Sequence, residues 1–119
     1  MAVLYIFRSY AEPTAFAAHA EIDQLEVVSL NQEGFSWVYI KPGEHSFKIR
    51  WSSLSGMPDL EFKKSLEAGK VYAFQILGSV KELTPNATTN SSLSHVKIEV
   101  AKEKMKACCS YVQSRYKRN

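Results

Sequence analysis

The stretch from Phe35 to Trp51 constrains the fold more than any other part of this sequence. Runs rich in β-branched and aromatic residues occupy 35–40 and 46–51, on either side of Lys41-Pro42-Gly43-Glu44-His45. This pattern predicts two strands joined by a tight turn. Pro42 fixes φ near about −65°, and Gly43 tolerates the positive φ that a type II turn needs next. We therefore expect residues 35–51 to form a β-hairpin.

The second strand of this predicted hairpin alternates between apolar and polar side chains. Phe47, Ile49 and Trp51 fall on one face, and the residues between them are polar. Tyr72, Phe74 and Ile76 share a face of a later run in the same way. These six aromatic and aliphatic residues are our candidates for the core.

Six segments outside this hairpin have strand-like composition, with turns at intervals of eight to twelve residues: 2–8, 15–22 with 26–30 as a second hairpin, 60–66, 71–77 and 93–100. The first is apolar throughout, so we expect it to be interior to a sheet or covered on both faces. Gly34 is available for positive φ in the turn at 31–34, and the polar segments 52–58 and 84–92 are expected to be loops. The pattern predicts an antiparallel β-sandwich of about seven strands.

From Ala101 onward the period of the apolar residues changes to helical. Ala101, Met105, Cys108, Val112 and Tyr116 fall at steps of three and four. We expect one domain over residues 1–119, with the sandwich at 2–100 and an amphipathic helix at 101–117 that lies on a sheet. A chain of 119 residues is long enough to bury a core without staples.

The net charge of +3 is unevenly distributed. Six basic residues and one acid lie from Lys102 onward, so this end carries +5 and the remainder −2. A basic end on a mildly acidic body is able to meet phosphates or an anionic membrane surface, but we favour the simpler interpretation, a solvated helix face with a frayed basic end.

Two adjacent cysteines, Cys108 and Cys109, and three scattered histidines complete the inventory of reactive groups. Neighbouring cysteines lie closer together than ordinary disulfide geometry prefers, so we expect two free thiols. The histidines have no metal-ligand spacing. We expect no metal and no cofactor.

Glu44 and His45 are the only neighbouring acid–base pair that the sequence offers for hydrolysis. On an extended chain neighbouring side chains point to opposite faces, so the two do not readily act on one proton. No phosphate loop, nucleophile elbow or HExxH motif occurs. We therefore do not expect an enzyme, and a hydrolase that uses these two residues is the least favoured alternative.

A partner surface is predicted on the outer side of the hairpin, at Trp37, Tyr39, Lys48 and Arg50. These residues alternate away from the apolar positions, so all four would share one surface that combines flat aromatic area with positive charge. Such a mixture suits an acidic glycan or an acidic protein patch. The alternative is that the helix or a loop covers the aromatic residues.

Several of these segments resemble a bacterial family, domain of unknown function 2846: the opening run 2–8, the Ile22-Asp23-Gln24 turn, Pro42-Gly43-Glu44-His45, and 68–72. The Pro-Gly-Glu-His turn also resembles that of PEGA repeats, small envelope-associated β-domains. The resemblance spans about residues 2–80 and departs at Asp23-Gln24, where such families usually have Asp-Gly.

The resemblance implies a non-catalytic binding or structural module of the bacterial cell envelope, periplasmic or an outer-membrane lipoprotein, with a protein or glycan partner. Membrane contact would then be through a lipid anchor that this chain does not contain. A native start at Met1 would instead favour the cytoplasm. The alternative function is a basic-tailed domain that binds an anionic membrane or nucleic acid, although we do not expect a nucleic-acid partner.

Overall fold

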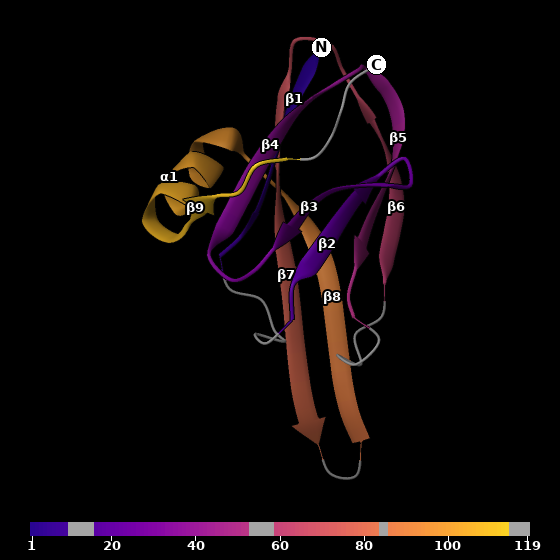
Figure 1. The fold of residues 1–119 in the computed structure, drawn as a ribbon, viewed down its shortest axis with the longest axis vertical. Helices are drawn as coiled ribbons and strands as arrows, with labels where there is room; N and C mark the ends of the chain where they lie inside the picture. Colours follow the sequence, from indigo (N-terminus) through magenta and orange to yellow (C-terminus); the bar gives the residue numbers. More distant parts are fainter. Residues whose placement is uncertain (10–15, 53–58, 84–85, 115–119) are drawn as a thin grey trace.

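A computed structural model describes residues 1–9, 16–52, 59–83 and 86–114, and of the strand residues between 79 and 92 it describes only the backbone. It contains nine strands and one helix: β1 (Ala2–Arg8), β2 (Ala18–Ile22), β3 (Leu25–Leu30), β4 (Gly34–Ile40), β5 (Gly43–Arg50), β6 (Leu60–Leu66), β7 (Val71–Leu83), β8 (Asn86–Val96), α1 (Ile98–Cys108) and β9 (Ser110–Tyr111). The elements form two layers of sheet with the helix on one side (Figure 1).

The predicted mainly-β sandwich with a C-terminal helix is confirmed. One sheet has the strand order β8-β7-β1-β4-β9, which we call the helix-side sheet, and the other has the order β3-β2-β5-β6. Two pairings in the helix-side sheet are parallel, β1 with β7 and β4 with β9. All other strand pairings in both sheets are antiparallel. Because β1 and β7 are far apart in sequence, strand patterns alone do not show this parallel pairing.

The core lies between the two sheets, and the six predicted core residues are all buried: Phe47, Ile49, Trp51, Tyr72, Phe74 and Ile76. A second, smaller cluster lies on the outer side of the helix-side sheet, where Ala101 and Met105 of α1 pack on Phe7 and Ala73. Strand β1 is therefore covered on both faces, as its apolar sequence predicts.

The predicted hairpin around Pro42-Gly43 is wrong in its pairing. Strand β4 pairs with β1, and β5 pairs with β2 and β6, so the two strands belong to different sheets. Gly43 does take a positive φ, of 116°. The turn residues reverse the chain locally, but they do not decide which strand each arm bonds to, and here the turn carries the chain from one sheet to the other.

The second predicted hairpin, β2–β3, is confirmed. Its two-residue turn holds Asp23 at φ 51° and Gln24 at φ 70°, as in the type I′ turns that match the twist of a sheet. In the next turn Glu33 takes the positive φ that we expected of Gly34. At Gly34 space is limited instead, since a Cβ there would lie 3.2 Å from Leu30 Cδ2 and 3.3 Å from the carbonyl oxygen of Asn31, and these neighbours would have to shift by a few tenths of an ångström.

Three boundaries in the second half of the chain differ from the predictions. Residues 86–92 form part of β8, which pairs along its length with β7 to make a long two-stranded arm (Figure 1). Of the loop predicted at 84–92, residues 84–85 lie outside the described residues. Of the loop predicted at 52–58, residues 53–58 do. The helix begins at Ile98 and ends at Cys108, so Val112 follows β9 and Tyr116 lies outside the described residues.

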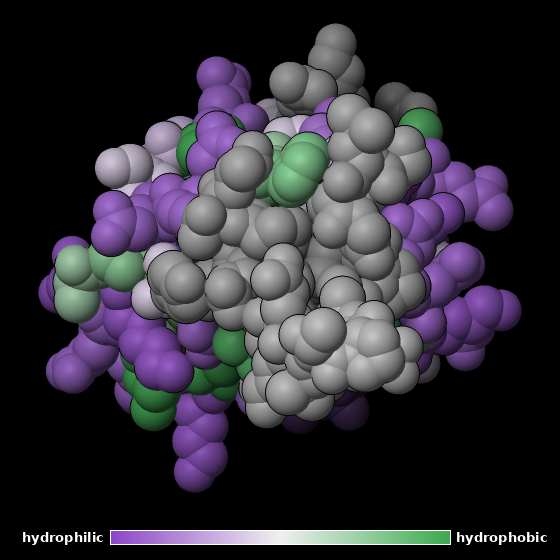
Figure 2. All heavy atoms as spheres, turned by 90° about the horizontal axis from the view of Figure 1, so that it is seen from below, coloured by the Kyte–Doolittle hydropathy of each residue, from purple (hydrophilic) through white to green (hydrophobic). Residues whose placement is uncertain are grey.

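The molecule is elongated, with principal dimensions of 49 × 30 × 21 Å. Seen along its long axis, hydrophilic side chains project on both flanks, and smaller hydrophobic patches lie among them (Figure 2).

Candidate functional site

The four residues predicted to share a surface lie on two different sheets. Trp37 and Tyr39 project from the outer face of the helix-side sheet, whereas Lys48 and Arg50 project from the outer face of the other sheet. The core lies between them. The composite surface therefore does not form, because β4 and β5 are not a hairpin.

Lys48 and Arg50 are also occupied by carboxylates. Arg50 contacts Glu21 through Nε at 3.0 Å and Glu26 through Nη2 at 3.1 Å. Lys48 Nζ lies 3.6 Å from Asp59 Oδ2. These charges tie neighbouring strands of one sheet together, and a partner would have to compete for them.

The aromatic half of the predicted surface is retained and extended. Alternation along β4 places Phe35, Trp37 and Tyr39 on one face, and we call these three residues the β4 aromatic stripe. The rings of Trp37 and Tyr39 meet edge to face with centroids 5.0 Å apart, and Tyr111 of β9 packs on Phe35 at 5.7 Å. Tyr39 is 51% exposed and Trp37 half-buried, so the helix does not cover this end of the stripe.

Part of the outer edge of β4 has no partner strand among the residues that the structure describes. Its outer neighbour β9 is two residues long and pairs only with Gly34 and Phe35. Val112 donates its N–H to the Phe35 carbonyl at 2.8 Å. Backbone groups alternate in direction along a strand, so the N–H and C=O of Trp37 and Tyr39 point to the same side as this carbonyl. Within the described chain, no strand pairs with them there.

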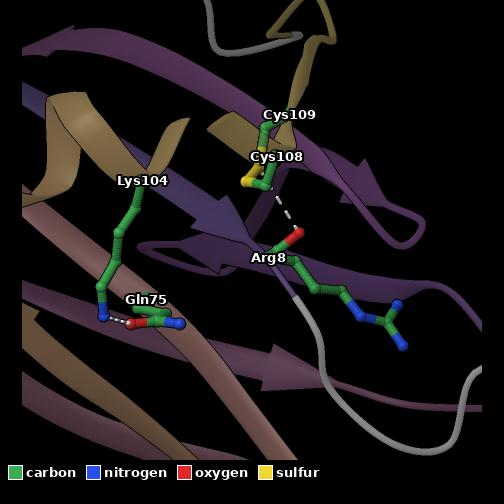
Figure 3. Close-up of a disulfide and its surroundings, with 5 residues drawn as sticks. All are labelled: Arg8, Gln75, Lys104, Cys108 and Cys109. Atoms are coloured by element: carbon green, nitrogen blue, oxygen red, sulfur yellow. Dashed lines mark hydrogen bonds between the residues drawn. A yellow bond between two sulfur atoms is a disulfide. The ribbon is translucent and has the colours of Figure 1, made fainter. Parts of the chain in front are cut away.

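A hollow of about 240 Å³ lies next to Phe35, where α1 meets the sheet. Phe35, Met105 and Cys109 give it apolar walls, and Lys102 and Lys106 complete its lining. Lys104 is not part of this lining, and its Nζ donates a hydrogen bond to Gln75 Oε1 at 3.3 Å (Figure 3). The stripe therefore leads toward a small pocket with two lysines.

Cys108 and Cys109 form a disulfide, which corrects the prediction of two free thiols. The helix ends at Cys108 and Cys109 is extended, with φ −125° and ψ 142°. This change of conformation between the two residues brings their side chains together (Figure 3). Cys109 Sγ lies 3.8 Å from the carbonyl oxygen of Arg8, so the bridge also lies against β1.

His45 is paired with Asp23 and not with its sequence neighbour Glu44. Its Nδ1 lies 2.6 Å from Asp23 Oδ2, and its Nε2 lies 2.7 Å from the carbonyl oxygen of Lys41. Both ring nitrogens thus face acceptors, and the side chain is 11% exposed. This arrangement fixes the ring between two turns and leaves neither nitrogen directed at a substrate.

In the ranges that the structure describes, no group of three or more His, Cys, Asp or Glu side chains is arranged to hold a metal ion. No helix in those ranges is long and apolar enough to cross a membrane.

The sequence alone identified Trp37 and Tyr39 but missed Phe35, Lys102 and Lys106. The alternation of 35, 37 and 39 was the available signal for Phe35. The lysines come close to it only because β9 returns the chain to β4 after the helix, which no local pattern indicates.

Comparisons with models of known protein families, with curated proteins and with solved structures find no match to this chain. The resemblance to the envelope family therefore stays a prediction.

Proposed function

We propose that this domain is a non-catalytic binding module that takes an extended, acidic segment of a partner protein along β4. The observation that carries the proposal is the coincidence, at Trp37 and Tyr39, of a partly exposed aromatic pair with backbone groups that no strand of the described chain pairs with on their outer side. In recognition by strand addition, main-chain hydrogen bonds supply affinity and the alternating side chains supply specificity.

The ring geometry favours a protein over a glycan. A sugar stacks best on a broad flat surface, but the planes of Trp37 and Tyr39 are inclined at 85°. Such an inclined pair offers apolar area in two directions, which aliphatic or aromatic side chains of a bound segment are able to contact. The backbone groups beside them, which no described strand pairs with on this side, have no evident use in sugar binding.

The charge near the stripe favours an acidic partner. Lys102 and Lys106 line the hollow beside Phe35 and are exposed. Surface charges of this kind mainly accelerate and orient association. An anionic membrane or nucleic acid, the alternative given by the basic end of the chain, would use the same lysines but would not need the stripe.

The contacts of His45 support a non-catalytic role. A general base needs a ring nitrogen within reach of the proton that it abstracts, and here both nitrogens already face Asp23 and Lys41. The envelope location is part of the proposal and rests on the resemblance alone; a lipobox cysteine in an upstream signal segment would support it.

The test is an amide NMR titration with a capped eight-residue peptide of alternating glutamate and valine, with a lysine–valine peptide of the same length as control. We expect shifts at Trp37 and Tyr39 with the acidic peptide only. Shifts confined to lysines of α1, with equal binding of a DNA oligonucleotide, would overturn the proposal in favour of a general anion binder.

A pair of variants at one position separates backbone from ring contributions. Tyr39→Ala removes the ring, whereas Tyr39→Pro removes the ring and the outward N–H, without touching the bonds to β1. We expect the proline variant to bind more weakly than the alanine variant by about fivefold to tenfold, the value of one hydrogen bond. Equal affinities would exclude strand addition. A chain ending at Ser114 tests whether residues 115–119 compete for the edge.

A further inference from the structure

The two sheets do not close on each other between β6 and β8, which are the edge strands of their respective sheets. A groove of about 450 Å³ opens there, and we call it the β6–β8 groove. Its lining includes Phe62, Phe74 and Leu93, with Lys64 and His95 among the polar members. This volume lies within the range of about 300–1,000 Å³ typical of small-molecule sites.

The apolar part of the groove is continuous with the aromatic core. Phe62 stacks on Phe47 with centroids 5.4 Å apart, and Phe74 lies 6.3 Å from Phe62. Phe62 is half-buried although it belongs to this cluster. An apolar ligand in the groove would therefore cover aromatic area that the fold leaves partly open.

The polar part of the groove is cationic. Lys64 lies on the inward side of β6, with Nζ 6.0 Å from the centre of the Tyr72 ring. His95 lies over Phe74 and Tyr72 at centroid distances of 5.3 and 5.8 Å. No ion pair joins Lys63 or Lys64 to a carboxylate in the described part of the chain, and no acidic side chain lines the groove.

An inward lysine on an edge strand also has a role that needs no ligand, because such a charge prevents edge-to-edge pairing with another sheet. That role does not require a histidine opposite. The presence of His95 across the groove, held against two aromatic rings, is the observation that goes beyond edge protection.

We propose that the β6–β8 groove binds an amphipathic carboxylate, with its apolar chain on Phe62, Phe74 and Leu93 and its head group between Lys64 and His95. The ammonium of Lys64 would contribute a charge-assisted hydrogen bond, and the imidazole would contribute a second donor. This site is independent of the β4 aromatic stripe. The stripe lies on the outer face of the helix-side sheet, toward the edge opposite to β8.

The probe is decanoate below its micelle concentration, with decyltrimethylammonium as the charge-reversed control of equal chain length. We expect decanoate to shift the signals of Leu93 and His95, with an affinity that falls as salt rises. The cationic control should bind at least about tenfold more weakly. Equal affinities, or shifts at Trp37 and not at Leu93, would overturn the assignment.

Variants of Lys64 complete the test. Lys64→Met keeps the aliphatic stem and should weaken decanoate binding about tenfold, whereas Lys64→Arg keeps the charge and should bind within about threefold of the parent. Lys41→Met, on an exposed lysine outside the groove, should have no effect. A Lys64→Met protein that dimerises on size exclusion yet binds decanoate unchanged would show that Lys64 only protects the edge.

Discussion

The imidazole of His45 on β5 lies 2.6 Å, from Nδ1 to Oδ2, from the carboxylate of Asp23 in the β2–β3 turn. The other carboxylate oxygen, Oδ1, accepts the backbone N–H of Ser46 at 3.0 Å. Asp23 thus joins its own turn to the start of the neighbouring strand. It does so from a position with positive φ, which Asp tolerates better than most residues.

This contact predicts a loss of stability in acid. Partial burial raises the pKa of Asp23, but the hydrogen bonds from His45 and Ser46 outweigh it and hold the pKa below the ordinary value of 3.8. A lowered pKa means that the stabilisation is complete above pH 3.8 and is lost as the pH falls through the lower, folded value.

Asp23→Asn should therefore lower the free energy of unfolding by about 0.2–1 kcal/mol near neutral pH, the range for an exposed or part-exposed ion pair. The difference from the parent should vanish in strong acid. Urea unfolding of both proteins between pH 6 and pH 2 checks this, and a constant difference at every pH would contradict it.

The buried ring of Trp51 predicts a large effect of truncation. It is 3% exposed, and the guanidinium of the buried Arg8 lies 5.0 Å from its ring centre. Trp51→Ala removes core contacts and also leaves the cation without its aromatic partner. We expect a cost of about 3–5 kcal/mol. An unchanged melting temperature would refute this placement of Trp51, and Trp51→Phe is the conservative control.

The core was predictable because it depends on local alternation. Phe47, Ile49 and Trp51, like Tyr72, Phe74 and Ile76, face inward whichever strands lie beside them. The hairpin was not predictable in the same way, because Pro42 and Gly43 fix backbone angles and not hydrogen-bond partners. The parallel contact of Leu4 with Tyr72 lies beyond any local signal.

In the candidate site, too, local alternation was predictable and strand pairing was not. Exposure of Tyr39 followed from alternation along one strand, but grouping it with Arg50 required the two strands to share a sheet. The polar run at 86–92 has low intrinsic strand propensity, and its pairing with β7 is a tertiary effect.

The position of His95 predicts how its titration responds to Lys64. Partial burial, followed by the nearby positive charge of Lys64, lowers the pKa of His95 from the ordinary value of 6.5. Lys64→Met removes only the second cause, so it should raise the pKa part of the way back. NMR titration of the ring checks the direction, with Lys41→Met as control. A further fall in the variant would contradict the geometry.

The disulfide between adjacent residues predicts a small effect of reduction on stability. A cross-link stabilises chiefly by shortening the loop that it closes in the unfolded chain, and here the sequence separation is one residue. We expect reduction to cost about 1 kcal/mol or less. Urea unfolding with and without reductant measures this, with the Cys108→Ser, Cys109→Ser double variant as control. Mass spectrometry that finds two free thiols in the protein isolated without reductant would contradict the bridge.

The edge-to-face contact of Trp37 and Tyr39 predicts how accessible the stripe is to solvent. In a protein carrying Trp51→Phe, the fluorescence of Trp37 alone is measured. Half-burial and the neighbouring ring should give quenching by iodide between that of a buried and a free tryptophan. Tyr39→Ala in this background should increase the quenching, because the ring that covers one side of Trp37 is removed. The same change should lower the free energy of unfolding by about 0.5–1.5 kcal/mol. If quenching is negligible and does not change in the Tyr39→Ala variant, another part of the chain covers Trp37. In that case an incoming segment could not use the stripe.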